Sequence, residues 1–331
     1  MNSEYIRVSV GTAAVLGLVK MQLDAIPTTA YLMLFSEKRC LANCGFCPQA
    51  RESKARIDYL SRIIWPKFEL LEVKKAFESL LEQEKFERIC IQAINYTGFF
   101  DDLVGVVETL NSLGIPLSVS VQPLNAEQMK KLHELKVSRI GIPLDAATRT
   151  LFYNIKGKGA KGPYKWEKYF NNLELAQSIF GQTNVSTHLI IGLGETEFEA
   201  VKFIQQVIDS KVLPALFTFT PIKGTNFETK SRPTLFQYRK MQLARYLIKN
   251  KICRMKDFTF NEDKELINFG IPKEKLYEII QTGKPFLTSG CSGCNRPYYN
   301  ERPGEELYNY PRPLTDEEIY QIVKQFEEKL K

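Results

Sequence analysis

The sequence predicts an α/β protein built around a partial barrel of six parallel strands. Between Thr29 and Thr220, short apolar runs alternate with amphipathic segments, as they do in repeated βα units. After Thr229 the pattern changes to one long helix, expected over 234–250, and a tail rich in Pro and Tyr. We therefore expect an N-terminal extension over residues 1–28, the barrel over 29–229, and a C-terminal helix and cap over 230–331.

Six segments have the composition of barrel strands, because they carry mainly β-branched or aromatic residues between Gly, Pro or polar positions. They lie at residues 30–35, 88–93, 116–121, 138–144, 184–191 and 213–220. Apolar residues recurring every three or four positions predict crossover helices at 70–84, 101–113, 126–135 and 196–210. A barrel of this kind carries its chemistry on the loops that follow its strands.

Composition argues against several classes of protein. A chain of 331 residues with 44% hydrophobic residues can bury a large core. Its longest apolar stretch, residues 8–19, is interrupted by polar residues and is shorter than the roughly 20 residues of a membrane span, so a buried strand or helix is expected there. The net charge of +7 comes from dispersed basic residues, which disfavours nucleic-acid binding.

The cysteines favour metal ligation in a reducing cytoplasm, because three of the seven lie in one short loop. Cys40, Cys44 and Cys47 directly follow the first strand candidate with C-x3-C-x2-C spacing. A 4Fe-4S cluster usually takes four cysteines, so three would leave one iron open to another ligand. A structural zinc site is the alternative, but zinc prefers four nitrogen or sulfur ligands, and neither His133 nor His188 is near in sequence.

This spacing, with Phe46 just before the last cysteine, resembles the signature of the radical S-adenosylmethionine (radical SAM) superfamily. The resemblance implies a TIM-like radical SAM barrel in which S-adenosylmethionine binds the open iron of the cluster. One electron, from a donor such as ferredoxin, then yields methionine and a 5′-deoxyadenosyl radical that abstracts hydrogen from an unactivated carbon.

Further cofactor contacts are implied at the ends of later strands. The segment from Gly192 to Glu195 is similar to the family's adenine-contacting G-x-I-x-G-x-x-E region, and a Glu near a helix start is also favourable electrostatically. Gln122 and Asp145 end the third and fourth strand candidates, where they would meet the ribose or the methionyl group. Turn or helix-capping roles are equally open for both.

The second strand candidate departs from the family pattern. Where the family often has a Gly-Gly-Glu-like sequence that binds the methionyl amine, this chain reads Gln92-Ala-Ile-Asn95. Gln92 and Asn95 are therefore the candidates for that contact. Cys90 is the only cysteine on a strand candidate, and one thiolate cannot hold the 2Fe-2S cluster that biotin synthase builds inside its barrel. We expect Cys90 to be a small buried apolar side chain.

The tail contains a second cysteine motif, Cys291-Ser-Gly-Cys294, and Cys253 lies earlier in the same region. These three residues are predicted to hold an auxiliary 4Fe-4S cluster. The fourth ligand is left open among Ser289, Ser292, Arg296 and a group from outside the protein. A zinc knuckle or free thiols in a folded cap are the alternatives.

Within the superfamily, the chain resembles the biotin synthase-like and lipoyl synthase branch, and most of all a subunit of the archaeal two-protein lipoyl synthase. This resemblance lies in residues 28–31, 47–53 and 291–304. It implies a sulfurtransferase that inserts sulfur into the octanoyl chain of a lipoyl carrier protein or peptide, together with a paired radical SAM protein. The alternatives are an auxiliary cluster that only transfers electrons, biotin synthase-like sulfur insertion into another substrate, and a metal-stabilised binding protein.

Overall fold

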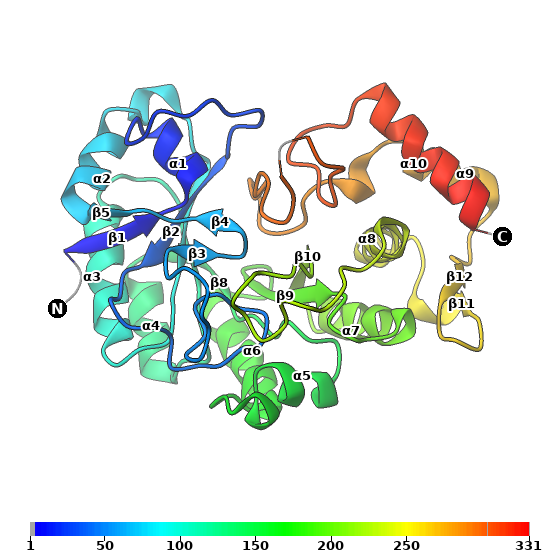
Figure 1. The fold of residues 1–331 in the computed structure, drawn as a ribbon, viewed down its shortest axis with the longest axis horizontal. Coiled ribbons are helices and arrows are strands. Elements are labelled where there is room, and N and C mark those ends of the chain that lie inside the picture. Colours follow the sequence, from blue (N-terminus) through cyan, green and yellow to red (C-terminus); the bar gives the residue numbers. More distant parts are fainter. Residues whose placement is uncertain (1–3, 303, 331) are drawn as a thin grey trace.

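The computed structural model describes residues 4–302 and 304–330, and it confirms the predicted α/β fold with a parallel six-stranded partial barrel. The strands are hydrogen-bonded in the order β2-β6-β7-β8-β9-β10, each parallel to its neighbour. They are β2 (Thr29–Leu34), β6 (Arg88–Gln92), β7 (Leu117–Ser120), β8 (Val137–Gly141), β9 (Val185–Ile191) and β10 (Leu213–Thr218). Figure 1 shows helices around the outside of this curved sheet.

Every connection between barrel strands contains a helix. Four match the predicted crossovers, and a fifth follows β10: α2 (Leu70–Glu78), α3 (Phe99–Asn111), α4 (Ala126–Glu134), α7 (Glu197–Asp209) and α8 (Leu235–Lys249). The sequence pattern did not identify α5 (Arg149–Ile155) and α6 (Trp166–Phe180), which connect β8 to β9. Asn125 and Thr196 begin α4 and α7 with reciprocal capping boxes, which fix where these helices start. Within the described ranges, none of the helices has both the length and the apolar character of a membrane span.

The N-terminal segment extends the sheet beyond the barrel. The apolar stretch 8–19 divides between the end of β1 (Tyr5–Val8) and α1 (Val10–Val15), which Ser9 caps through its hydroxyl. β1 pairs antiparallel with β2 on one side and with β5 (Lys67–Glu69) on the other. A short hairpin, β3 (Tyr59–Leu60) and β4 (Ile63–Ile64), lies in the connection from β2 to β6.

The barrel interior is lined by polar and sulfur-containing side chains as well as apolar ones. On β6, Ile89 and Ile91 are fully buried, while Cys90 and Gln92 line an internal cavity. This alternation follows from the two-residue period of a strand. Since small or polar side chains replace the bulky residues that fill a closed barrel, a cavity of about 270 Å³ remains.

The C-terminal tail lies between the first and last barrel strands. Its regular elements are β11 (Thr259–Phe260), β12 (Leu266–Asn268), α9 (Lys273–Gln281) and α10 (Asp316–Lys329). Short 3₁₀ turns occur at Leu81–Gln83, Lys158–Ala160, Met255–Asp257 and Lys284–Phe286. The hydroxyls of Thr28 and Thr29, at the start of β2, donate to the Gly293 carbonyl at 2.6 and 2.7 Å. On the side of the tail that faces β10, the backbone amide of Leu216 donates to the Ser289 hydroxyl at 2.7 Å.

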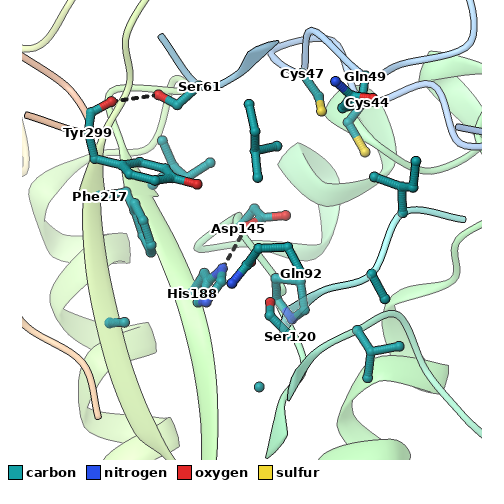
Figure 2. A pocket seen from close by; sticks show the side chains of 18 of the residues that line it. Cys44, Cys47, Gln49, Ser61, Gln92, Ser120, Asp145, His188, Phe217 and Tyr299 are labelled. Atoms are coloured by element: carbon teal, nitrogen blue, oxygen red, sulfur yellow. Dashed lines mark hydrogen bonds and ion pairs between the residues drawn. The ribbon is translucent and has the colours of Figure 1, made fainter. Parts of the chain in front are cut away.

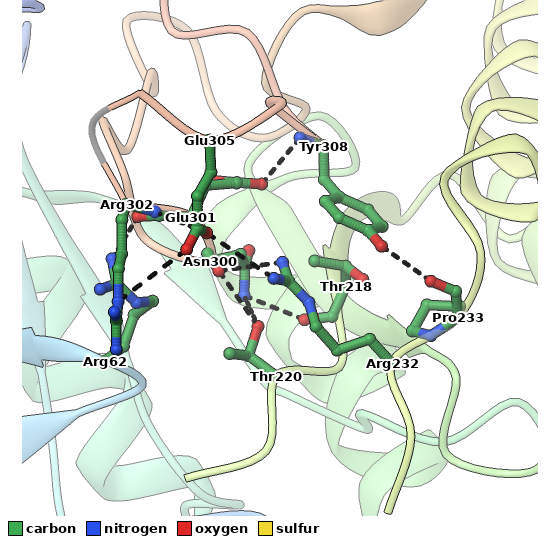
Figure 3. Close-up of polar contacts among 10 residues, drawn as sticks. All are labelled: Arg62, Thr218, Thr220, Arg232, Pro233, Asn300, Glu301, Arg302, Glu305 and Tyr308. Carbon is green, nitrogen blue, oxygen red and sulfur yellow. Dashed lines mark hydrogen bonds and ion pairs between the residues drawn. The ribbon is translucent and has the colours of Figure 1, made fainter.

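Figure 3 shows a second attachment of the tail to the end of β10. The Asn300 amide donates to the Thr218 carbonyl at 2.9 Å, and Arg232 donates to the Asn300 carbonyl at 3.1 Å. The Tyr308 hydroxyl donates to the Pro233 carbonyl at 2.8 Å. Because these bonds satisfy buried polar groups at both ends, the tail is a fixed wall of the barrel.

Candidate active site

The cysteine loop follows β2 and is held at the carboxyl ends of the strands by backbone hydrogen bonds. The Leu41 amide donates to the Asn95 carbonyl at 2.6 Å, and the Gly45 amide donates to the Ile155 carbonyl at 2.8 Å. Gly45 also has no room for a side chain, since a Cβ there would lie 2.6 Å from the Phe227 ring. These contacts place Cys40, Cys44 and Cys47, here called the first cysteine group, on the cavity wall.

The three thiols of the first cysteine group are close enough to influence one another. Burial raises the pKa of Cys44 to about 12, and burial together with Cys44 and Cys40 raises the pKa of Cys47 well above its usual value. Three neighbouring thiolates in such a site therefore need positive charge, which iron supplies on binding. In residues 4–302 and 304–330, no three His, Cys, Asp or Glu side chains are placed to share a single metal ion. Three cysteines of one loop line the cavity, and three thiolates suit a 4Fe-4S cluster with one open iron, whereas zinc prefers four nitrogen or sulfur ligands.

The predicted cofactor contacts near the second strand do lie at the cavity. The Asn95 amide donates to Cys40 Sγ at 3.3 Å, and its side chain donates to the Tyr164 hydroxyl at 3.4 Å. Gln92 lines the cavity and donates from Nε2 to Cys90 Sγ at 3.1 Å. Figure 2 shows Gln92 beside Asp145 and His188, with Cys44 and Cys47 on one side and Phe217 and Tyr299 on the other.

Phe46, Gln122 and Asp145 also line the cavity. Within the described part of the chain, Nε2 of Gln122 is buried and has no hydrogen-bond partner, so it is available to a bound molecule. Asp145 forms an ion pair within the protein, because its Oδ2 lies 2.7 Å from the Lys156 ammonium.

Gly192 and Glu195 are not among the residues that line the cavity. The Glu195 carboxylate folds back and accepts from the backbone amides of residues 192–194 at 2.6, 3.0 and 3.2 Å. Gly192 has a φ of +100°, and a Cβ there would lie 2.5 Å from Pro233. In this structure both residues shape the turn from β9 to α7.

Sequence reasoning missed a buried ion pair in the cavity wall. Lys156 follows α5, and its ammonium donates both to Asp145 Oδ2 and to the Pro143 carbonyl at 2.7 Å. Burial by itself lowers the pKa of Lys156, but Asp145 and Cys44 outweigh it and raise that pKa. No local motif marks Lys156, because its partner Asp145 lies eleven residues earlier, on the other side of α5.

His188 on β9 is a neutral side chain of the cavity. Burial, with contributions from Arg296 and Lys156, lowers its pKa from 6.5 to about 3. His188 Nδ1 lies 3.9 Å from Asp145 Oδ1. Because the imidazole is neutral at neutral pH, this contact is not an ion pair there. Between pH 6.5 and 3 the unfolded chain binds a proton at this imidazole that the folded chain does not, so stability is lost as the pH falls through that range.

We expect His188→Gln to reduce the acid sensitivity of the metal-free protein. Going from pH 7 to pH 5, the wild-type protein should lose about 2 kcal/mol of unfolding free energy more than the variant does. Urea unfolding of both proteins at the two pH values measures this difference. An equal pH dependence would show that the imidazole protonates freely in the folded state.

A second cysteine group lies deeper in the same cavity. Cys90, Cys291 and Cys294 all line it, and Cys291 and Cys294 both add to the rise in the pKa of Cys90 that burial causes. Cys90, expected to be a small buried apolar side chain, thus faces the cavity. The structure does not bring Cys253 to this group, since Cys253 is 7% exposed, packs in the hydrophobic core and is absent from the cavity lining.

Comparison with known proteins identifies the family. Residues 37–207, more than half of the chain, match the family model of the Radical SAM superfamily. The protein therefore belongs to the radical SAM superfamily, whose members use a 4Fe-4S cluster and S-adenosylmethionine. No curated protein sequence matches the chain significantly.

Solved structures of low sequence identity share the fold. The FeFe-hydrogenase maturase HydG aligns with a TM-score of 0.53 at 15% identity, over 67% of this chain and 49% of HydG. HydG from Carboxydothermus hydrogenoformans gives a TM-score of 0.52 at 16% identity, over 67% and 51%. Methylornithine synthase PylB gives 0.53 at 12% identity, over 72% and 67%. The chain thus spans about half the length of HydG, and the likeness concerns the fold alone.

Proposed function

We propose that the protein is a radical SAM sulfurtransferase of the lipoyl synthase type, which inserts sulfur into the octanoyl chain of a lipoyl carrier protein. The observation that carries the proposal is that two cysteine groups line one cavity. When bound, a cluster on the first group with S-adenosylmethionine would supply a 5′-deoxyadenosyl radical, and a cluster on the second group would supply sulfide. An alkyl chain bound in this cavity would contact walls that carry both groups.

The cavity wall between the two cysteine groups suits an alkyl substrate. Several apolar side chains from different strands and loops line it, namely Ile94, Val121, Ile190, Phe217, Phe219 and Ile222. Each methylene of an octanoyl chain buried there contributes about 0.8 kcal/mol to binding. His188 is neutral and Asp145 is paired with Lys156, so neither adds net charge to this part of the wall.

The proposed reaction requires partners from outside the chain. At each insertion a C–H bond of the octanoyl chain would break and its hydrogen atom would leave in 5′-deoxyadenosine. A cluster held by the second cysteine group would supply the sulfide that bonds to the carbon and would take up the one electron released. The electron that cleaves S-adenosylmethionine comes from a donor such as ferredoxin. A paired radical SAM protein would perform the other of the two insertions. We place this chemistry in the cytoplasm, because thiolate ligation of clusters suits a reducing compartment.

The test is anaerobic reconstitution followed by reaction with an octanoylated carrier peptide, S-adenosylmethionine and a chemical reductant. We expect mass spectrometry to show a gain of one sulfur on the peptide, with 5′-deoxyadenosine formed in parallel. The control is Cys291→Ala, which should still form 5′-deoxyadenosine but transfer no sulfur. If the wild-type protein forms 5′-deoxyadenosine with this peptide while all cluster sulfide stays intact, the second cluster transfers electrons and the proposal is wrong.

A further inference from the structure

The barrel interior presents three thiols to one cavity, those of Cys90, Cys291 and Cys294, and two of them come from the tail. Cys90 is at the centre of β6, where its Cα partners are Tyr31 on β2 and Ser118 on β7. The Tyr31 hydroxyl lies 3.6 Å from Cys294 Sγ, so the tail reaches the strand next to Cys90. Cys90 precedes Gln92 by two residues along β6. Cys90 therefore lies roughly 6.6 Å farther than Gln92 from the carboxyl ends of the strands.

The turn that carries Cys291 and Cys294 is rigidly placed. The Cys294 amide donates to the Cys291 carbonyl at 3.0 Å, which closes the turn. The Gly293 carbonyl accepts hydrogen bonds from the hydroxyls of Thr28 and Thr29 at the start of β2. The backbone amide of Arg296 donates to the Tyr31 hydroxyl at 2.9 Å. Both thiols are therefore presented to the cavity by hydrogen bonds within the protein itself.

Cationic side chains surround this second cysteine group. Arg296 donates from Nη1 to Cys294 Sγ at 3.4 Å, and its Nη2 is fixed by the Ser289 carbonyl at 2.8 Å. Arg88, with 8% exposure, interacts electrostatically with all three thiols of the group, and Arg139 with Cys291. Hydrogen bonds and positive charge around cysteine sulfur are what a buried anionic iron–sulfur cluster requires.

Cys253 lies in a different part of the molecule. Among the described residues, Asp257 is the only charged group that perturbs its thiol. β11 and β12, which follow it in the chain, lie beyond α7 and α8 from the barrel strands in Figure 1. A cluster between Cys291 and Cys294 would thus meet Cys90 and not Cys253.

We propose that Cys90, Cys291 and Cys294 are the protein ligands of a second 4Fe-4S cluster inside the barrel, and that Cys253 is a structural thiol. Three protein ligands would leave one iron without a cysteine. The assignment deepens the proposed function, which needs a second cluster, but its test reads iron content and not sulfur transfer. Failure of the ligand assignment and failure of the sulfur chemistry are thereby distinguishable.

The experiment uses a background in which the first cysteine group is replaced by alanine, so that bound iron reports the second site alone. After anaerobic reconstitution, this triple variant should hold about four irons and four sulfides per chain and show a broad visible absorption. Adding Cys90→Ala should reduce the iron to well below one per chain. Adding Cys253→Ala, the matched control, should leave about four.

Two results would overturn the assignment. One is a Cys90→Ala variant that keeps its iron while Cys253→Ala loses it, and the other is a triple variant that binds no iron or binds only zinc. Cys90→Ser, which changes one atom in the cavity wall, repeats the test with a smaller change in packing. Circular dichroism of the metal-free variants distinguishes loss of a ligand from loss of the fold.

Discussion

Cys44→Ala is expected to abolish radical formation. Cys44 is the middle cysteine of the first cysteine group in the sequence, and hydrogen bonds to Asn95 and Ile155 hold its loop in place. The loop has no further cysteine to replace it. The variant should hold about four fewer irons per chain than the wild-type protein. Production of 5′-deoxyadenosine should fall by at least about 1,000-fold, a small part of the 10⁶-fold or greater acceleration that enzymes provide.

The measurements are iron analysis and chromatography of 5′-deoxyadenosine after anaerobic reaction with a strong reductant. Cys253→Ala serves as the control, because it removes a thiol outside the cavity and should keep both the iron and the activity. A Cys44→Ala variant with wild-type iron content would contradict the placement of the radical-forming cluster on this loop.

Lys156→Met is expected to destabilise the protein by about 3–5 kcal/mol, the usual result of removing one partner of a buried ion pair. The two side chains are only 3% and 10% exposed and meet at 2.7 Å, so removing the ammonium leaves a buried carboxylate without its paired charge. The variant also loses the contact of that ammonium with the Tyr169 ring, whose centre is 4.8 Å away.

Urea unfolding of the metal-free protein measures this loss, and pH gives it a second signature. Burial raises the pKa of Asp145, and Lys156 is the group that opposes this rise. Without Lys156, the carboxyl takes up a proton more readily in the folded state, so the destabilisation should be smaller at pH 5 than at pH 8. Combining Lys156→Met with Asp145→Asn should recover most of the stability. A loss of less than about 1 kcal/mol in the single variant would contradict a tightly paired site.

The sequence predicts those features of the fold and the site that depend on residues close together in the chain. The six barrel strands and four crossover helices follow from short-range periodicity, and Cys40, Cys44 and Cys47 were recognised because their spacing lies within one loop. The sequence pattern did not identify α6, although its buried residues Tyr169, Leu173 and Ala176 recur at helical spacing.

Contacts between distant segments could not be predicted in this way. The sequence predicts that Cys90 only packs in the core, because no other strand carries a thiol, yet the tail brings Cys291 and Cys294 to the same cavity from about two hundred residues later. Glu195 matches a motif in sequence, but its carboxylate is bound by the backbone of its own turn.

By itself, the sequence determined the barrel and the three-cysteine loop, because strand periodicity and ligand spacing depend on neighbouring residues. The tertiary structure alone decided which thiols share the cavity and that Lys156 neutralises Asp145. The reason is geometric: parallel strands bring residues far apart in the chain into register, and a tail fitted between β2 and β10 adds side chains whose neighbours no local pattern specifies.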